Sequence, residues 1–439
     1  MKVILSFLLV ISLSNLTTAQ TTAIPDANFE FALYWQGYDV ILDGFVSTAV
    51  ISNITNLSVN GFNINDLTGI EDFISLTELQ CFDNNLTSIN LSQNTALTTL
   101  LCENNQLTNL DVSQNPALTT LLCYNNQLTS LNLIGANSLS KIFFWDNNLT
   151  SLDVSQNLNL SYLLGSHNQL TNLDVTQNIA LDTLICDYNP LISVDVTQNI
   201  ALKYFGCGYA SLTSIDFSQN IALENLYIVY NQLTNIDVSQ NINLKDLRCN
   251  NNQISSINVN GTSALEIFDC KFNQLTTLDL SQNSNLYAIY CAYNQLTCLN
   301  IKNGNNTNIA YIDMRNNTNL TCVEVDDVSY ASSNNYFVRD IQTYYSTWCN
   351  NACSVGMDEN SLPNISLYPN PTTGKITIDL GGIKQYAKTT LINSLGQVLL
   401  TQNYGSTNYI NLELVCPKGM YFLTLETDGE VITKKIIKN

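Results

Sequence analysis

The sequence predicts a mostly β protein in which a parallel β-solenoid is followed by a small β-sandwich. Two observations predict the solenoid. The fourth residue of every copy of a 21-residue repeat is apolar, and leucine starts eleven copies with ten identical spacings, at Leu76, Leu97, Leu118, Leu139, Leu160, Leu181, Leu202, Leu223, Leu244, Leu265 and Leu286. A third observation predicts the sandwich. Near residue 365 the repeat gives way to alternating segments separated by Gly, Asn and Pro turns.

Each copy can be numbered from its leucine as positions 1 to 21. Positions 4 and 6 are mostly apolar and alternate with positions 3, 5 and 7, the pattern of a short strand with one buried face. One copy cannot bury that face alone, whereas stacked copies pair their strands in parallel around a continuous core. The repeat therefore predicts about 13 coils of 21–22 residues over 54–326, with 54–75 as a longer first copy and 309–325 as an irregular last one.

The consensus L-x-x-L-x-C-x-x-N-x-L resembles the leucine-rich repeat signature, and the first copy resembles the internalin-like kind. Position 9 is Asn in every regular copy except the one with Ala210. We expect these side chains to turn inward as a ladder that satisfies backbone groups. The second half of each copy repeats the apolar spacing, for example at Leu110 and Val112, and predicts a second extended segment on the opposite side of the coil.

Position 6 holds eight of the 13 cysteines, and other copies place Phe144, Gly165 or Ile228 there. This exchange with apolar or small residues favours buried free thiols over a disulfide column or a metal site. In-register neighbours of a parallel sheet suit disulfide geometry poorly, and a 21-residue step is not the local spacing of metal ligands. The eight are Cys81, Cys102, Cys123, Cys186, Cys207, Cys249, Cys270 and Cys291.

The N-terminal end is predicted to carry an export signal and a cap. Residues 1–19 resemble a signal peptide, with Lys2, the apolar run VILSFLLVIS and small residues up to Ala19. That run is too short to span a bilayer, and no other segment approaches transmembrane length. Residues 20–53 form the predicted N-terminal cap, with an amphipathic helix that closes the first coil through Phe29, Leu33 and Tyr34.

The C-terminal end of the solenoid is predicted to be closed by a second cap, residues 327–353. Cys298 and Cys322 fall at position 13 of the last two copies, and with Cys349 and Cys353 they gather at this end. Export permits disulfides, and we expect one between Cys322 and Cys349. A polar linker over 354–364 follows the cap.

Residues 365–439 read as strands over 367–380, 391–402, 416–429 and 432–439. The segment resembles the C-terminal sorting domain of the Bacteroidota type IX secretion system, which implies recognition by that translocon and a product that is released or held at the outer cell surface. The residues that carry the resemblance are Tyr368, Pro369, Asn370, Pro371, Gly374, Lys418, Gly419, Tyr421, Lys434 and Lys435.

The charge balance argues against a nucleic-acid partner. The chain has 16 basic and 36 acidic residues, a formal net charge of −20, whereas phosphate contacts need clustered Lys and Arg. The imbalance lies before residue 365, because the tail holds seven Lys against five acidic residues. This shift supports a domain boundary at that point.

The sequence offers no catalytic constellation and implies no cofactor. The single histidine, His167, has Cys186 as the nearest nucleophile in register, yet the cysteine is predicted to face the core. No Gly-rich phosphate loop, H-E-x-x-H or G-x-S-x-G motif is present. A glycosidase-type carboxylate pair remains open, although nothing singles one out.

Position 15 carries aspartate in five successive coils: Asp153, Asp174, Asp195, Asp216 and Asp237. The structural interpretation is a column whose repulsion is offset by hydrogen bonds from nearby Ser and Thr. The alternative is a row of calcium ions, for which the G-G-x-G-x-D signature is missing.

Positions 3, 5, 7 and 8 are predicted to face outward, and 13 of their 44 slots are aromatic, about 30% against 9% for the chain. Strand propensity is one explanation, and a binding face is the other. A shallow depression is expected where Ser166, Gly206 and Gly208 are small. The predicted binding face comprises Phe143, Trp145, Tyr162, His167, Asp187, Tyr188, Tyr204, Tyr209, Tyr227, Tyr230, Phe272, Tyr290 and Tyr293.

These observations predict a secreted or cell-surface, non-enzymatic binding or adhesion protein that recognises a protein or a glycan through its aromatic face. An inert structural spacer is the main alternative, and a hydrolase is the weaker one.

Overall fold

The structure is a computed structural model that describes residues 20–349, 353, 366–369, 371–393, 397–427 and 430–438. The expected signal peptide (1–19), the expected linker (354–364) and Asn370 of the expected sorting signal lie outside the described residues. The chain divides into two compact units, Met1–Asn351 and Ala352–Asn439. None of the helices in the described part of the chain is long and apolar enough to cross a membrane.

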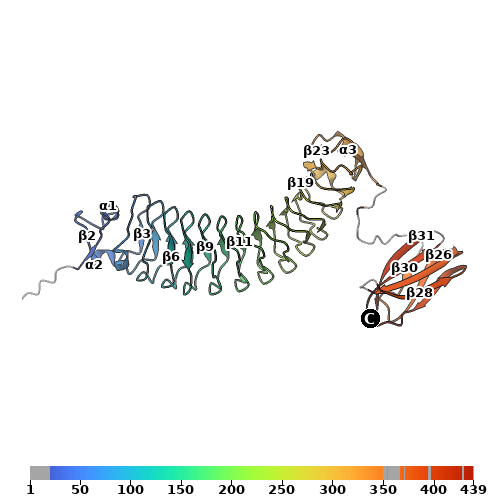
Figure 1. The fold of residues 1–439 in the computed structure, drawn as a ribbon, viewed down its shortest axis with the longest axis horizontal. Helices are drawn as coiled ribbons and strands as arrows, with labels where there is room; N and C mark the ends of the chain where they lie inside the picture. Colours follow the sequence, from blue (N-terminus) through green and yellow to red (C-terminus); the bar gives the residue numbers. More distant parts are fainter. Residues whose placement is uncertain are drawn as a thin grey trace, which may run out of the picture. The chain divides into compact units, whose positions relative to one another are not determined.

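The first unit is a solenoid built on one parallel sheet (Figure 1). Positions 3 to 5 of each coil form its strand, and neighbouring strands pair in register, so that Leu163 lies between Ile142 and Leu184. The thirteen strands of the coils are β3 (Asn56–Ser58), β4 (Glu78–Gln80), β5 (Thr99–Leu101), β7 (Thr120–Leu122), β9 (Lys141–Phe143), β10 (Tyr162–Leu164), β11 (Thr183–Ile185), β12 (Tyr204–Gly206), β13 (Asn225–Tyr227), β15 (Asp246–Arg248), β17 (Ile267–Asp269), β19 (Ala288–Tyr290) and β21 (Tyr311–Asp313).

The predicted C-terminal cap extends this sheet by one more strand. β23 (Phe337–Val338) pairs in parallel with β21, so the sheet has 14 strands and the solenoid about 14 turns. The cap therefore continues the hydrogen-bond ladder instead of only covering its end.

The second extended segment forms regular strands in only part of the stack. Between residues 133 and 234, all of which the structure describes, positions 13 to 15 form no strand. The strands of this opposite side are β6 (Asn109–Asp111), β8 (Ser130–Asn132), β14 (Asn235–Asp237), β16 (Ser256–Asn258), β18 (Thr277–Asp279), β20 (Cys298–Asn300), β22 (Cys322–Glu324) and β24 (Tyr344–Ser346).

The core of the solenoid is one continuous apolar cluster that runs along the whole stack. The eight cysteines at position 6 are all buried and free, which confirms the packed-thiol interpretation. Burial raises the pKa of Cys81 and Cys249, so these thiols stay neutral. Phe144 exceeds the size of this slot, and Gly165 of the next coil makes room, because a Cβ there would lie 1.9 Å from Cζ of Phe144.

Two ladders of buried asparagine join the coils. At position 9, Oδ1 of Asn126 accepts from Leu107 N at 3.0 Å, and its Nδ2 donates to the carbonyls of Cys102 and Cys123. The sequence predicted this ladder. It missed a second one at position 19, where Nδ2 of Asn199 donates to two carbonyls of the preceding coil. Buried backbone groups that no strand partner reaches are thus satisfied at both bends.

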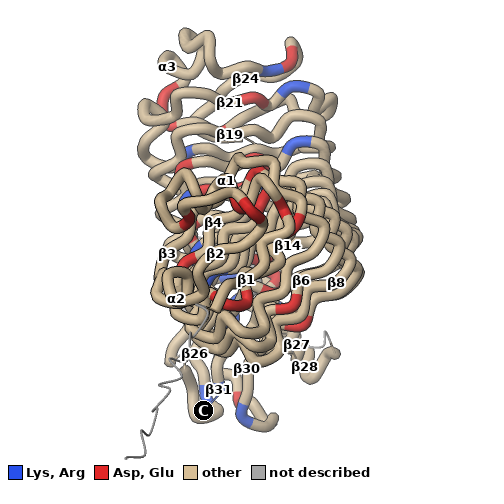
Figure 2. The backbone as a smooth tube through the Cα atoms, turned by 90° about the vertical axis from the view of Figure 1, so that its left-hand side faces the viewer, with Lys and Arg blue, Asp and Glu red and all other residues tan. Residues whose placement is uncertain are grey.

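The N-terminal cap closes the first coil with two helices and a two-stranded antiparallel sheet: β1 (Thr21–Ala23), α1 (Ala27–Trp35), β2 (Phe45–Ser47) and α2 (Thr48–Ile51). Figure 2 views the stack from this end, with the cap in front. Phe29 packs against Phe73 with ring centroids 6.2 Å apart. The expectation for Tyr34 was wrong, because it is 45% exposed and Glu30 is buried in its place. The Glu30 carboxylate accepts from the backbone of Asp43 and Gly44, which explains its burial.

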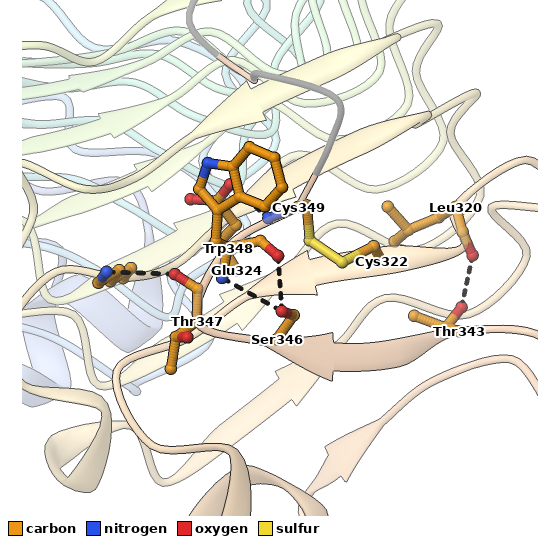
Figure 3. Close-up of a disulfide and its surroundings, with 9 residues drawn as sticks. Leu320, Cys322, Glu324, Thr343, Ser346, Thr347, Trp348 and Cys349 are labelled. Atoms are coloured by element: carbon orange, nitrogen blue, oxygen red, sulfur yellow. Dashed lines mark hydrogen bonds between the residues drawn. A yellow bond between two sulfur atoms is a disulfide. The ribbon is translucent and has the colours of Figure 1, made fainter.

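The C-terminal cap carries a disulfide between Cys322 and Cys349, the same pair that the sequence analysis joined (Figure 3). Their Cα atoms lie 6.0 Å apart, and Cys349 N donates to Glu324 at 3.0 Å. Cys298 is also disulfide-bonded. The remaining elements of this unit are η1 (Ile70–Asp72), η2 (Asn306–Asn308) and α3 (Val328–Ser333).

The second unit consists of two antiparallel sheets that share one apolar core. Its described residues form seven strands, whereas the sequence analysis predicted four segments. The segment over 367–380 spans the first two strands, most of Ala387–Asn393 was missed, and no predicted segment covers Thr407–Glu413. One sheet has the order β25 (Ser366–Tyr368), β26 (Lys375–Lys384), β29 (Thr407–Glu413), and the other the order β28 (Val398–Tyr404), β27 (Ala387–Asn393), β30 (Gly419–Thr427), β31 (Glu430–Lys438).

Candidate binding surface

Position 8 of each regular coil has a left-handed backbone conformation, with φ between 50° and 57° from Asp83 to Tyr293. The sequence analysis grouped this position with the outward-facing slots of the sheet, but it lies beyond the strand. The strands end at position 5, and the chain turns at position 8 so that position 9 can enter the core. The conformation favours Gly, Asn and Asp, and a bulky residue adopts it at a cost of about 1 kcal/mol or more.

Six of these eleven left-handed positions nevertheless carry a ring. His167, Tyr188, Tyr209 and Tyr230 occupy four successive coils, and we name them the aromatic ladder. Successive ring centroids lie 4.2, 4.1 and 4.3 Å apart, with interplanar angles of 12°, 10° and 15°. Phe272 and Tyr293 form a shorter stack of the same kind, at 4.3 Å and 14°.

Strand propensity does not explain the aromatic ladder, because its residues are not in strands. Each stacked pair contributes about 0.5–1.5 kcal/mol beyond area burial, which is comparable to the conformational cost at position 8. The rings remain substantially exposed: Tyr188 by 43%, Tyr209 by 41% and Tyr230 by 45%. The fold does not need rings here, since other coils place Asn or Asp at the same φ.

The coils nearer the N-terminus carry a polar counterpart, which we name the polar ladder: Asp83, Asn104 and Asn125. Nδ2 of Asn104 donates to Oδ1 of Asp83 at 2.8 Å, and Nδ2 of Asn125 donates to Oδ1 of Asn104 at 2.7 Å. The same column of the solenoid thus presents amides and a carboxylate in one stretch and rings in the next.

The aromatic residues at positions 3, 5 and 7 are half-buried instead of fully exposed. Trp145 stacks on Tyr124 at 4.0 Å, and Phe143 packs against Trp145 at 5.8 Å. Tyr162 lies beneath the Lys141 ammonium at 5.4 Å, and Tyr290 beneath that of Lys271 at 4.9 Å. These rings already have partners within the sheet face, which leaves position 8 with the more accessible ones.

Tyr227 is the centre of a charged cluster on the sheet face. Its hydroxyl donates to Oδ2 of Asp246 at 2.9 Å, and Tyr204 meets its ring edge-on at 5.1 Å. Arg248 covers the ring at 5.1 Å and pairs with both oxygens of Asp246, at 2.9 and 3.0 Å. Burial and Asp246 raise the pKa of Tyr227, so the phenol stays protonated and donating.

The expected depression around Gly206 and Gly208 is occupied by a side chain. Oδ1 of Asp187 accepts from Gly208 N at 2.5 Å, and Cβ atoms at Gly206 and Gly208 would lie 3.3 and 3.2 Å from its carboxylate. Burial raises the pKa of Asp187, while Gly208 N–H and His167 act in the opposite direction. The glycines therefore make space for this carboxylate, and Tyr188 and Tyr209 stack on each other instead of surrounding a hollow.

The aspartates of position 15 cap the turn that follows them. Asp153, Asp174, Asp195, Asp216 and Asp237 each accept from the backbone N–H two residues on, at 2.8 to 2.9 Å. These bonds lower the pKa of Asp153 and Asp174 and favour the charged form. The column thus has a structural role. Among the described residues, no group of three or more His, Cys, Asp or Glu is placed to hold a metal ion.

His167 and Cys186 lie in different environments and do not form a nucleophile–base pair. His167 is exposed and stacked on Tyr188, whereas the Cys186 thiol is buried and contacts Gly206 O at 3.4 Å. A hydrogen bond to Cys207 and burial raise the pKa of Cys186, which is the opposite of what a thiolate nucleophile requires.

The residues of the expected sorting signal lie at turns and strand ends of the second unit. Tyr368 ends β25, Gly374 precedes β26 with its carbonyl accepting from Leu414 N at 2.7 Å, and the Tyr421 hydroxyl donates to Pro417 O at 2.7 Å. Pro369 and Pro371 follow β25, Lys418 precedes Gly419 at the start of β30, and Lys434 and Lys435 lie in β31.

One exposed row escaped the sequence analysis. Position 20 is aliphatic in five successive coils and 57–61% exposed in all of them. We name Leu158, Ile179, Ile200, Ile221 and Ile242 the aliphatic stripe. Aligning the copies by position would have revealed it, but sequence alone does not show that a residue beside the buried Asn of position 19 points outward.

Comparison with known proteins agrees with this architecture. Residues 366–439 match the family described as secretion system C-terminal sorting domain. Internalin J of Listeria monocytogenes is 35% identical over 71 residues, which are 16% of this chain and 8% of that protein. The chain thus spans a small part of that relative.

Two solved structures extend the likeness to most of the chain. The functional domain of InlJ from Listeria monocytogenes, which includes a cysteine ladder, is 26% identical, with a TM-score of 0.57 and coverage of 97% of this chain and 100% of that one. An internalin (InlF) from the same species is 22% identical, with a TM-score of 0.59 and coverage of 76% and 100%. The second likeness concerns the fold alone.

The fold and the tail together define an internalin-like leucine-rich repeat protein that carries a secretion sorting domain after its solenoid. A sorting domain of this kind implies interaction with a secretion system and a secreted or cell-surface location.

Proposed function

We propose that the solenoid is a non-enzymatic binding or adhesion module that engages a protein partner through the aromatic ladder, after delivery by the type IX translocon to the outer surface or the medium. The observation that carries this proposal is the use of rings at left-handed positions where other coils use Asn at the same φ. Rings supply a large contact area at a low entropy cost, and Tyr is enriched at the centres of protein interfaces.

A glycan partner is the second candidate of the sequence analysis, and the ring geometry favours it less. A sugar stacks on an open ring face, but Tyr188 and Tyr209 have a ring within 4.3 Å on both faces. Their exposed parts are the ring edges and the hydroxyl groups, which suit hydrogen bonds and edge contacts with protein side chains.

The test is binding of the purified chain to arrays of extracellular proteins and of glycans, followed by the double variant Tyr188→Asn/Tyr209→Asn. Asn is the residue of the polar ladder at the same backbone conformation, so the thermal midpoint should change little. The matched control is Tyr287→Asn, which removes a tyrosine that is 55% exposed and outside the ladder.

We expect the double variant to weaken binding to a protein at least about tenfold and the control to leave it unchanged. Equal binding by the native chain and both variants would contradict the proposal, and the absence of any specific ligand would support the inert-spacer alternative. Binding confined to glycans would favour the second candidate.

A further inference from the structure

The aliphatic stripe lies on the edge of the main sheet where the chain enters each strand, opposite the edge that carries the aromatic ladder. Each of its residues sits at a turn closed by a bond such as Leu202 N to Asn199 O, at 3.0 Å. The adjacent buried asparagine anchors the turn, so the aliphatic side chain cannot enter the core. Other coils place Thr95, Pro116, Asn137, Ser263 and Ser284 at this position.

The fold therefore does not need an aliphatic residue at position 20. Neighbouring coils are spaced by about 4.8 Å, so five successive exposed aliphatic side chains form a continuous apolar strip. Monomeric proteins rarely leave such strips open, and those that remain open usually mark interfaces.

A row of charged residues, which we name the charge ladder, runs beside the stripe at position 2, three residues further along the chain. Its members alternate in sign: Asp182, Lys203, Glu224, Lys245 and Glu266, the last of which lies one coil beyond the stripe, where position 20 is Ser263. Within the chain, Lys203 pairs with Asp182 at 2.7 Å and Lys245 pairs with Glu224 at 2.8 Å. Both lysines stay about half exposed, at 55% and 51%, so each retains donors for a further carboxylate.

The residue types of the charge ladder also differ from those at position 2 of the earlier coils. In earlier coils position 2 is Thr or Ser, and its hydroxyl donates to the carbonyl of the preceding coil, as in Thr98 to Thr77 at 2.9 Å and Thr119 to Thr98 at 3.0 Å. A neutral residue is thus sufficient for the fold. The charges begin at Asp182, alongside the central part of the stripe.

The aliphatic stripe and the charge ladder together form four successive layers. Each layer pairs an isoleucine with a charged residue: Ile179 with Asp182, Ile200 with Lys203, Ile221 with Glu224, and Ile242 with Lys245. Read along the solenoid, the signs are negative, positive, negative, positive. Read in the opposite direction, the signs are positive, negative, positive, negative. The pattern is therefore complementary to an antiparallel copy of itself.

We propose that this edge is an isologous interface between two copies of the chain, packed antiparallel about a two-fold axis between the layers of Lys203 and Glu224. A two-fold axis at right angles to the solenoid axis brings stripe onto stripe and ladder onto ladder. Ile200 then faces Ile221 of the second copy, and Lys203 faces its Glu224. In the outer layers, Asp182 faces Lys245 in the same way.

The charge ladder can offset the electrostatic repulsion that opposes self-association of this acidic chain. The chain has a formal net charge of −20, so most surfaces of two copies repel each other. Along this edge the pairing brings opposite charges together across an apolar strip. Because the strip covers only about five coils, a weak, concentration-dependent dimer is expected.

The test is sedimentation equilibrium of the full chain over a wide range of concentrations. The native chain should show a monomer–dimer equilibrium, and Ile200→Asp/Ile221→Asp should remain monomeric. The matched control is Ile134→Asp, because Ile134 is 59% exposed but lies outside the stripe, and it should dimerise like the native chain. A native chain that is monomeric throughout, or a double variant that dimerises normally, would overturn the proposal.

A charge swap separates pairing between copies from ion pairs within one copy. Lys203→Glu alone places like charges opposite each other twice per dimer and should raise the dissociation constant about tenfold or more. Adding Glu224→Lys restores opposite charges between copies, although it leaves both ion pairs within the chain broken. Recovery of dimerisation supports the interface, and failure to recover contradicts it. Tyr188→Asn serves as an independent control, because the aromatic ladder lies at the other edge.

Discussion

The polar ladder and the aromatic ladder occupy the same column of the solenoid and the same backbone conformation, yet they present different surfaces. Asp83, Asn104 and Asn125 use residue types that tolerate a left-handed φ and link to one another by hydrogen bonds. Tyr188 and Tyr209 occupy that conformation against their local preference and recover the cost by stacking. The comparison teaches that repeat geometry sets the backbone at position 8, while the side chain there is free to serve another purpose.

Other departures from the repeat gather in the same coils as the aromatic ladder. Ala210 interrupts the asparagine ladder, and Gly206 and Gly208 admit the carboxylate of Asp187. The aliphatic stripe and the first charges of position 2 also fall in this stretch. A coil needs only its buried positions to stack, so the exposed departures are the places where this chain differs from a plain rod.

The junction between the two regions should show the largest effect of a single substitution. Gly165→Cys would place a Cβ 1.9 Å from Cζ of Phe144, and overpacking of this kind costs about 3 kcal/mol. Adding Phe144→Cys should recover most of that loss, because cysteine is the residue of position 6 in the neighbouring coils. Urea unfolding of the full chain measures both effects, and equal stability of the two variants would contradict the packing argument.

The asparagine ladder distinguishes the two regions at a smaller scale. Asn126→Ala, beside the polar ladder, leaves Leu107 N and the Cys102 carbonyl without their partner and should cost about 2 kcal/mol. Ala210→Asn, beside the aromatic ladder, should stabilise the chain by about 1 kcal/mol, since it supplies the missing rung. Hydrogen exchange of the flanking coils checks both directions. Destabilisation by Ala210→Asn would mean that the break in the ladder is required there.

The smallest effect concerns pH and the carboxylate of Asp187. Because the pKa of Asp187 is raised, the folded chain keeps a proton that the unfolded chain releases. The contribution of this proton to the free energy of unfolding is complete below the ordinary aspartate pKa and is lost as pH rises through the pKa of the folded state. Asp187→Asn should therefore flatten the fall in unfolding free energy from about pH 4 upward.

Asp153→Asn is the control of opposite sign. The pKa of Asp153 is lowered by the N–H and hydroxyl of Ser155, so its contribution is present above the ordinary aspartate pKa and is lost as pH falls through the folded value. Thermal midpoints measured across the acid range would show the two variants diverging in opposite directions. Parallel curves for both variants would contradict the assignment.

Much of the solenoid could be predicted because the repeat has a fixed length. A constant step of 21 residues brings equivalent positions of successive coils into register, so Leu79, Leu100 and Cys102 could be assigned to the core and the Asn126 column to a ladder before any coordinates. The Cys322–Cys349 pairing followed from the place of both residues at one end of the stack. The alternation of the tail indicated its β structure, but it merged β25 with β26 and missed β29 and most of β27.

The candidate site could be predicted only in part, because its character depends on contacts between coils. The periodicity identified Tyr188, Tyr209 and Tyr230 as outward-facing, but the left-handed turn that carries them is set by the entry of position 9 into the core. Likewise, the small size of Gly206 suggested a hollow, and only the neighbouring coil shows that Asp187 fills it.

The sequence by itself determined which residues of this protein face the interior, because burial of one apolar stripe per coil follows directly from a repeat of constant length. Only the tertiary structure decided how the outward residues meet one another, because stacking distances of about 4 Å and the φ of each turn arise when neighbouring coils pack. The stacked rings of the aromatic ladder and the exposure of the aliphatic stripe both follow from that packing.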